Sequence, residues 1–460
     1  MAGESYAANG SRRSRRDSSW SQWALALLIF GAYNANGREV GSYDSQPTKF
    51  LAIEIAQRHS LSLDRVVART PAYGERPGFV KGLDGHYRSG YPIAPALLSA
   101  APAWLFSAIG LVDLDTPLAS GTFAKLTASS LTTAAVLLAF GIARRMGDRT
   151  AAALIALGFG LGTNLWPTAS QSLCQHETAV FGIAAALYIF SHAEERLTAR
   201  QMTCAFAALG LAGAARPQVA PALVVVALAL VRRGGMSRVW TAWPALLTVA
   251  AVMILNVSWF GSVLGALTAR ESMHLQVHAI RGIVNPTPWW GAAGLLLSPS
   301  RGILIFSPVV LVGVVGFWRV FRSEEPQEIW PWCAVAVTVQ FVVYSAYSVW
   351  WGGHTYGPRY LIDVLPFLVP GAAVAMSLIS PCPALKATAG ALLAWSILVA
   401  ATGAFCYPAD QWNTDPVDVD RRHERLWDWR DPQIVRCWTR GLAPQNWDLF
   451  VFAPELLRRR

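Results

Sequence analysis

The sequence has 460 residues, of which 53% are hydrophobic and only 14% are charged, and its formal net charge is +10. Soluble domains carry about 25% charged residues, so this composition excludes an ordinary water-soluble protein. The basic residues stand between long apolar runs, which is typical of membrane topology and argues against a nucleic-acid partner.

Apolar runs of about 20 residues, the length that crosses a bilayer, recur from the N-terminal region to about position 407. The first, at about 23–35, follows a basic segment. We predict an uncleaved first span behind a cytoplasmic tail of residues 1–19, and a cleaved signal peptide is the alternative. Further spans are expected at 121–143, 151–168, 176–192, 239–260, 303–321, 330–350, 359–379 and 384–406.

Two apolar stretches are interrupted by polar residues or prolines. The stretch 202–231 contains Arg216-Pro217, and a charge at mid-membrane costs about 2.5–3.5 kcal/mol while proline removes a backbone donor. We therefore predict two short helices that meet at Arg216 near the outer surface. The stretch 91–112 contains Pro92, Pro95 and Pro102, and we predict a re-entrant or interfacial pair of helices there.

These assignments place the arginines between spans on one side, as the positive-inside rule requires. The predicted fold is an all-α polytopic membrane bundle of about 11 transmembrane helices, with re-entrant or juxtamembrane helices in a first outer loop at 37–120. Residues 408–460 form a Trp-rich tail, which is either a small outer cap or a segment lying on the membrane surface. Among the six cysteines, only Cys406 and Cys437 are candidates for a disulfide.

The unusual polar residues all fall in the outer loops of this topology, whereas the inner loops are short basic connectors. The acids, imidazoles, cations and tyrosines concerned are Asp44, Lys81, Arg88, Tyr91, His176, Glu177, Arg216, Arg301, His354, Tyr356 and Arg359. Their gathering on one side predicts an active site at the outer membrane face.

Four of these segments resemble the GT-C superfamily of membrane glycosyltransferases, which includes protein O-mannosyltransferases and lipid A aminoarabinose transferases. They are the acid in Gly41-Ser42-Tyr43-Asp44, the segment 85–92, Glu177 beside His176 at the end of a later helix, and the glycine/arginine turns at 302–308 and 352–366. The resemblance covers about 20–407, and the tail resembles no family.

The resemblance implies an inverting transfer of a sugar from a polyprenyl-phosphate donor to an envelope lipid, polysaccharide or protein. Asp44 is then the general base that takes a proton from the acceptor hydroxyl, and Glu177 is a second catalytic acid. The other residues of the set bind substrate, since an arginine fork suits phosphate. The paired acids of metal-dependent members are absent, so no metal or other cofactor is indicated.

Simpler explanations stay open for each residue. Asp44 is otherwise an ordinary loop acid, and Arg359 a helix-start arginine reaching the interface, with Asp363 one turn later as its structural partner. A polytopic lipid or solute transporter and a non-catalytic subunit of polysaccharide assembly are the rival functions. We expect a multi-pass protein of a bacterial inner membrane with its active site on the periplasmic side.

Overall fold

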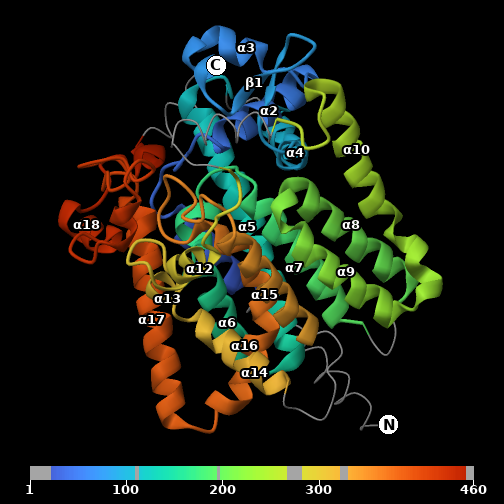
Figure 1. Cartoon of the computed structure of the whole chain (residues 1–460), viewed down its shortest axis with the longest axis vertical. Coiled ribbons are helices and arrows are strands. Elements are labelled where there is room, and N and C mark those ends of the chain that lie inside the picture. Colours follow the sequence, from blue (N-terminus) through green and yellow to red (C-terminus); the bar gives the residue numbers. More distant parts are fainter. Residues whose placement is uncertain (1–21, 109–112, 194–196, 267–281, 322–329, 452–460) are drawn as a thin grey trace, which may run out of the picture.

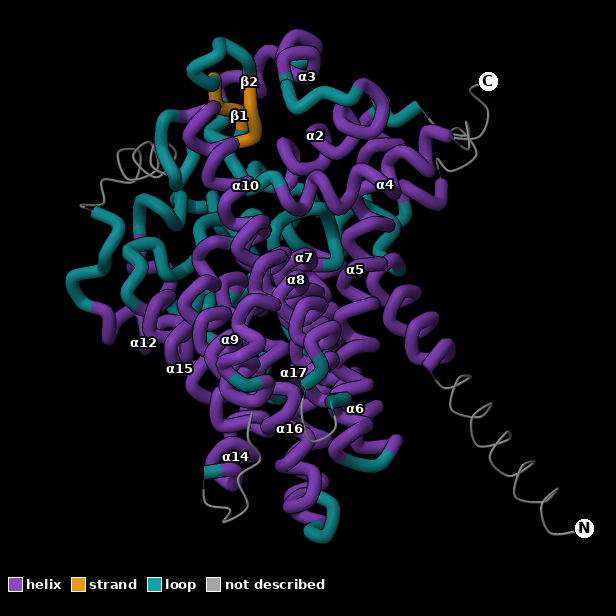
Figure 2. Tube along the Cα trace, turned by 90° about the vertical axis from the view of Figure 1, so that its right-hand side faces the viewer, coloured by secondary structure: helices purple, strands orange, loops and turns teal. Residues whose placement is uncertain are grey.

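The computed structural model describes residues 22–108, 113–193, 197–266, 282–321 and 330–451. Figure 1 shows a bundle of helices, with a small subdomain around α2, α3, α4 and β1 at one end. In Figure 2 the loops gather where the subdomain meets the bundle. This arrangement places the outer loops of the sequence together at one end of the helices.

The subdomain is built from the first outer loop, after an initial helix over 22–34. Its elements are α2 (Ser45–Arg58), α3 (Asp64–Arg69), a 3-10 turn (Pro71–Glu75), the antiparallel strands β1 (Phe79–Lys81) and β2 (Tyr87–Ser89), and α4 (Ala94–Ala108). Apolar residues such as Leu51 and Phe79 pack with Phe123 of the bundle in a core of their own. The short hairpin departs from the all-α prediction.

Of the predicted pair of helices at 91–112, the described residues 91–108 contain one helix, α4. Pro102 lies inside this helix, where a proline removes a single backbone hydrogen bond. Because α4 packs along α2, the remaining turns keep the helix intact.

The bundle begins with α5 (Pro117–Met146), α6 (Arg149–Leu161), a π-helical turn (Leu165–Ala169), α7 (His176–Ser191), α8 (Ala199–Ala215), a 3-10 turn (Pro217–Val219) and α9 (Ala220–Gly234). A 3-10 turn (Met236–Ala242) then leads into α10 (Trp243–Phe260). The predicted break at Arg216 is confirmed, because α8 ends at Ala215 and Arg216 itself has an extended backbone, the conformation that a following proline favours.

The second half of the bundle consists of α12 (Pro288–Leu297), α13 (Ile303–Phe306), α14 (Val310–Val320), α15 (Trp330–Ser345), a 3-10 turn (Arg359–Val364), α16 (Leu365–Ile379) and α17 (Pro383–Cys406). Glycines bring α14 and α16 into backbone contact, since a Cβ at Gly316 would lie 1.7 Å from the carbonyl oxygen of Gly371. Such small residues are typical of helix contacts in membranes.

Five helical stretches among the described residues are long and apolar enough to cross a bilayer. They are Pro117–Met146, Pro217–Gly234, Met236–Phe260, Arg359–Ile379 and Pro383–Cys406, and five shorter apolar helices of 10–17 residues accompany them. By helix length and composition the chain is a polytopic helical membrane protein. The predicted total of about 11 spans is not confirmed by this count, in part because the expected span 303–321 divides into α13 and α14 around Pro308.

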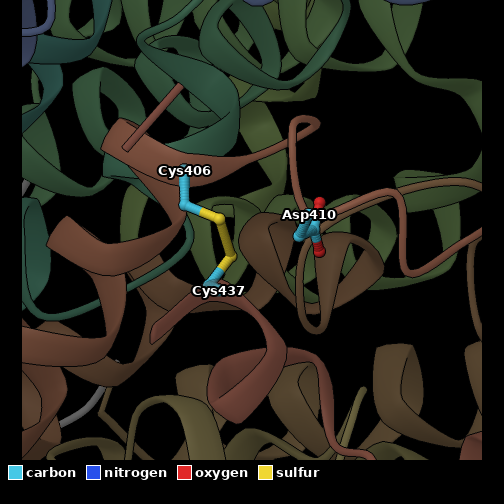
Figure 3. Close-up of side chains that lie close together, drawn as sticks. All are labelled: Cys406, Asp410 and Cys437. Carbon is cyan, nitrogen blue, oxygen red and sulfur yellow. A yellow bond between two sulfur atoms is a disulfide. The ribbon is translucent and has the colours of Figure 1, made fainter. Parts of the chain in front are cut away.

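Residues 408–451, which we call the C-terminal cap, pack on the loop end of the bundle. The cap contains a 3-10 turn (His423–Trp427) and α18 (Gln433–Arg440), and its side chains Trp412, Val419 and Leu426 are fully buried. The candidate pair Cys406 and Cys437 is bonded, and this disulfide joins the end of α17 to α18, with Asp410 beside it (Figure 3).

Replacement of Cys406 by serine is expected to lower the free energy of unfolding of the cap by about 3–4 kcal/mol, because the disulfide spans 31 residues and restricts the unfolded chain. Thermal unfolding of the purified protein in detergent measures the effect. The matched control is Cys204→Ser, since Cys204 is an exposed free cysteine. Equal unfolding temperatures for the two variants would contradict the prediction.

Candidate active site

A small polar cavity lies between the first outer loop, the turn after α6 and the loop before α16. Its volume is about 30 Å³, which is room for about one water molecule. Its walls include Ser42, Asp44, Ser172, His176, His354, Arg359 and Tyr407. The fold therefore brings together four of the predicted site residues, Asp44, His176, His354 and Arg359, from segments far apart in the sequence.

Asp44 and Arg359 form an ion pair in the wall of this cavity. Oδ2 of Asp44 lies 3.0 Å from Nη1 of Arg359, and the two side chains are 11% and 19% exposed. The Ser42 hydroxyl donates a hydrogen bond to the other carboxylate oxygen. Asp44 occupies the N-cap position of α2. All residues of α2 are described, and the Asp44 side chain makes no capping hydrogen bond to this helix. The carboxylate is turned toward the arginine instead.

The charge state of Asp44 follows from these contacts. Burial raises the pKa of the carboxyl, but the Arg359 guanidinium and the Ser42 hydroxyl outweigh burial, and the net pKa lies below its usual value. The carboxylate is therefore ionised at neutral pH. A buried anion of this kind depends on its cation for stability.

The loop 352–358 places His354 and Arg359 at the cavity. Gly352, Gly353 and Gly357 have φ values of 78°, 70° and 65°, a left-handed conformation that favours glycine. At Gly357 a Cβ would also lie 2.6 Å from the ring of Phe306. These three glycines thus allow the backbone turn that positions His354 and Arg359.

A second network of buried polar groups lies beside the first and centres on Asp363. Its oxygens lie 2.7 Å from Nε of Arg216 and 3.0 Å from Nδ1 of His176, and the Tyr344 hydroxyl donates to Oδ2 at 2.6 Å. Nη1 of Arg216 also lies 3.2 Å from Nε2 of His176. This network fixes the imidazole of His176 in the cavity wall.

The expectation that Asp363 pairs with Arg359 is wrong. Residues Arg359–Val364 form a 3-10 turn, in which three residues complete a turn, so positions four apart point about 120° away from each other. In an α-helix they would share a face. Arg359 consequently reaches Asp44, and Asp363 faces the other way, toward Arg216.

Arg301 lies in the seam between the bundle and the cap rather than in the cavity wall. Its guanidinium donates to Asn413 Oδ1 at 2.7 Å, to Gln433 Oε1 at 2.9 Å and to the Trp351 carbonyl at 3.0 Å. Burial lowers the pKa of Arg301 to about 10, so the side chain is still charged at neutral pH. This fully buried arginine joins cap residues to the loop before α16.

Glu177 and Tyr356 are buried and do not line the cavity themselves, but each contacts a residue that does, Cys174 and Tyr407 respectively. Glu177 accepts hydrogen bonds from the backbone N–H of Cys174 at 2.8 Å and from its thiol at 3.0 Å, so its carboxylate closes the turn that precedes α7. Tyr356 packs against Phe306 and donates its hydroxyl to the Val399 carbonyl at 2.9 Å. Both contacts support the segments that carry His176 and His354.

The remaining predicted residues lie on or near the hairpin of the subdomain. Lys81 is exposed on β1. Arg88 on β2 pairs with Asp84 and lies over the ring of Trp259, 4.8 Å from its centroid. Tyr91 follows β2 and interacts electrostatically with Arg359. The structure therefore brings Tyr91 toward the cavity and leaves Lys81 at the surface.

Lys125 is a buried lysine that the sequence interpretation missed. It lies in α5 with no exposed surface, and its Nζ donates to Asn36 Oδ1 at 2.7 Å and to Gln171 Oε1. These contacts join α5 to the start of the first loop and to the turn that carries Ser172. A lysine inside the apolar run 121–143 was a usable signal, since ionisable residues within membrane spans are rare and are often functional.

Comparisons with known proteins yield structural likenesses only. No protein-family model and no curated protein matches the sequence. The chain is similar to ArnT from Cupriavidus metallidurans bound to undecaprenyl phosphate, at 14% identity and a TM-score of 0.47, over 95% of this chain and 80% of that one.

Two structures of an Archaeoglobus fulgidus oligosaccharyltransferase are similar as well. The complex with Zn and sulfate has 13% identity and a TM-score of 0.44, over 89% of this chain and 57% of that one. AglB in complex with an inhibitory peptide and a dolichol-phosphate has 12% identity and a TM-score of 0.41, over 90% and 60%. The chain thus spans less than two thirds of the length of these two oligosaccharyltransferase chains.

Asp363→Asn is expected to lower the free energy of unfolding by about 3–5 kcal/mol, because it leaves the buried Arg216 without its carboxylate. Thermal unfolding in detergent measures the loss. Asp84→Asn removes a carboxylate that pairs with Arg88 at the surface of the subdomain and should leave the unfolding temperature unchanged. A small effect at both positions would show that the buried network contributes little to stability.

The stabilisation from Asp44 should depend on pH in a defined direction. Because the folded-state pKa of Asp44 is depressed, this stabilisation is complete above the unfolded-state pKa of about 4 and is lost as pH falls through the folded-state value. The difference in unfolding temperature between the wild type and Asp44→Asn should therefore stay constant from pH 8 to pH 5 and shrink only below about pH 4. A difference that already shrinks near pH 6 would contradict the assignment.

Proposed function

We propose that the chain is a membrane glycosyltransferase that moves a sugar from a polyprenyl-phosphate donor to an envelope lipid, polysaccharide or protein, with Asp44 as the general base. The observation that carries the proposal is the Asp44–Arg359 ion pair in a cavity wall at the loop end of an apolar bundle. It supplies a proton acceptor and a phosphate-binding cation at one point, which is the combination that the GT-C resemblance implies.

In this proposal the phosphate of the donor displaces Asp44 from Arg359. The exchange is chemically reasonable because the planar guanidinium donates two parallel hydrogen bonds to phosphate as well as to carboxylate. It also makes Asp44 a better base, since the cation that lowers its pKa is then shared with the phosphate. The cavity is too small for a phosphate while the ion pair is closed, so the pair opens on binding.

Transfer then follows from the freed carboxylate. The acceptor hydroxyl gives its proton to Asp44 as its oxygen bonds to the anomeric carbon of the sugar. The bond between that carbon and the phosphate oxygen breaks, and the phosphate leaves with the bonding electrons. Arg359 stabilises the charge that grows on the phosphate. Attack from the face opposite the phosphate gives inversion.

The neighbouring residues take supporting roles in the proposal. His176 contacts the sugar from the wall where Asp363 and Arg216 hold it, and Tyr91 closes the side toward the subdomain. Lys81 and Arg88 lie farther out and suit contacts with the acceptor. Glu177, Arg301 and Tyr356 act indirectly, because their polar atoms are engaged by the turns and the seam that surround the cavity.

An apolar cavity of about 430 Å³ suits the isoprenoid chain of the donor. It lies between α6, α14, α16 and α17, and its lining residues include Phe159, Val312, Leu368 and Leu393. It extends along α6 to Thr163, close in sequence to Pro167 and Thr168 of the polar cavity. The basic residues Arg144, Arg145 and Arg149 flank the turn at the other end of α6, which favours a periplasmic site.

Asp44→Asn is expected to reduce transfer by at least about 100-fold, the usual contribution of a general base, while the protein stays folded. The measurement is mass analysis of envelope glycans and lipids from a deletion strain that carries each variant. Glu75→Gln, which changes an exposed carboxylate of the same loop, should restore the wild-type pattern. If the envelope of the Asp44→Asn strain matches the wild type, the transferase proposal fails in favour of a transporter or an assembly subunit.

A further inference from the structure

The C-terminal cap places two carboxylates against His354, a residue in the wall of the polar cavity. Nε2 of His354 lies 3.0 Å from Oδ1 of Asp418 and 3.4 Å from Oδ2 of Asp420. Asp420 is 6% exposed at its side chain, and its other oxygen accepts a hydrogen bond from Trp351 Nε1 at 2.6 Å. Its backbone N–H donates to Asp418 at 2.9 Å. The two carboxylates are thus held in place before any ligand arrives.

The two edges of the His354 ring have different environments. The Nε2 edge faces the cap, while the residue lines the cavity together with Asp44 and Arg359. The His354 carbonyl accepts a hydrogen bond from the Tyr407 hydroxyl at 3.1 Å. Nδ1 has no hydrogen-bond partner among the residues that the structure describes. Because the carboxylates keep a proton on Nε2, the free nitrogen of the ring is Nδ1.

The cap is fastened to the bundle on both sides of these aspartates. Before them, Asn413 accepts a hydrogen bond from Arg301, and after them Gln433 accepts another. The Cys406–Cys437 disulfide adds a covalent joint to α17 (Figure 3). These contacts on both sides therefore hold the aspartates at a fixed distance from His354.

We propose that Asp418 and Asp420 are positioning residues of the active site: they orient His354 so that its Nδ1–H binds the phosphate of a polyprenyl-phosphate ligand together with Arg359. This inference rests on the proposed function. A phosphate oxygen accepts the Nδ1–H, while the carboxylates accept the N–H at the other edge of the ring. One loop then supplies both donors, at positions 354 and 359, and the cap is part of the site.

The test measures binding of undecaprenyl phosphate and of undecaprenol to the full-length protein in detergent. His354→Gln and the double variant Asp418→Asn/Asp420→Asn should each bind the phosphate about tenfold more weakly, the loss of one charge-assisted hydrogen bond, and bind the alcohol as the wild type does. The triple variant should be no weaker than His354→Gln, because the aspartates act through the histidine. The matched control is Asp428→Asn, since this cap carboxylate accepts, among the described residues, a hydrogen bond from the backbone of Arg430 alone.

The possible results separate this inference from the proposed function. Unchanged phosphate binding by the double variant, or additive losses in the triple variant, would overturn the positioning role. An equal loss for phosphate and alcohol would mean a structural role only. A wild type that does not distinguish phosphate from alcohol would reject the proposed function itself. The double variant also weakens the hydrogen bond from Trp351 to Asp420. If its unfolding temperature falls for that reason, Asp418→Asn alone replaces it in the test.

The ligand atoms of His354, Asp418 and Asp420 all lie within 4.8 Å of one another, so a divalent cation is the competing occupant of this cluster. Treatment of the wild type with a chelator decides between the two. Unchanged phosphate binding supports the imidazole contact. A loss that added zinc restores would assign the cluster to a metal and overturn the proposal.

Discussion

Charges buried at the end of an apolar bundle must be paired or hydrogen-bonded, and this requirement shapes the loop end of the molecule. An isolated ion in such a place costs several kcal/mol, and a single unpaired partner is strongly destabilising. The pairs here join positions that are distant in the sequence: Asp44 with Arg359, and Arg216 with Asp363. Pairing therefore holds the first loop, the α8–α9 break and the start of α16 together. The contacts that assemble the bundle are the contacts that form the site.

The two arginines beside the cavity, Arg216 and Arg359, differ in how deeply they are buried and in how many buried groups bind their carboxylate partners. Arg216 is 5% exposed and is bonded to the fully buried Asp363 and to Tyr344. Displacement of Asp363 would leave Arg216, His176 and Tyr344 buried without their hydrogen-bond partner. Arg359 is 19% exposed and shares the cavity wall with Asp44, so an incoming anion can reach it. In the proposed function, Arg359 exchanges Asp44 for phosphate while the Arg216–Asp363 pair keeps the surrounding fold intact.

Contacts with the cap explain the position of Arg301, a residue that resembles part of a family motif. Arg301 follows a Ser-Pro-Ser turn and looks like a phosphate ligand in the sequence, yet its donors bind the cap. The same seam orders the loop of His354. The C-terminal segment, which resembles no family, thus packs behind His354, a wall residue of the cavity, and holds the loop that carries it. Its disulfide and buried tryptophan give the cap the stability that its small size would otherwise lack.

The sequence by itself was sufficient for the features that depend on composition and on chain position. Apolar length defined the helices, Arg216-Pro217 defined a break because a charge and a missing N–H both oppose a continuous span, and the placement of basic residues gathered Asp44, His176, His354 and Arg359 at one end. Only the tertiary structure decided which charge meets which. A 3-10 turn sent Asp363 to Arg216 instead of Arg359, Lys125 found amide partners in two other segments, and Asp418 and Asp420 reached His354 from the cap. Sequence spacing does not encode these pairings, because each one depends on local helix winding and on the packing of segments from tens to more than a hundred residues apart.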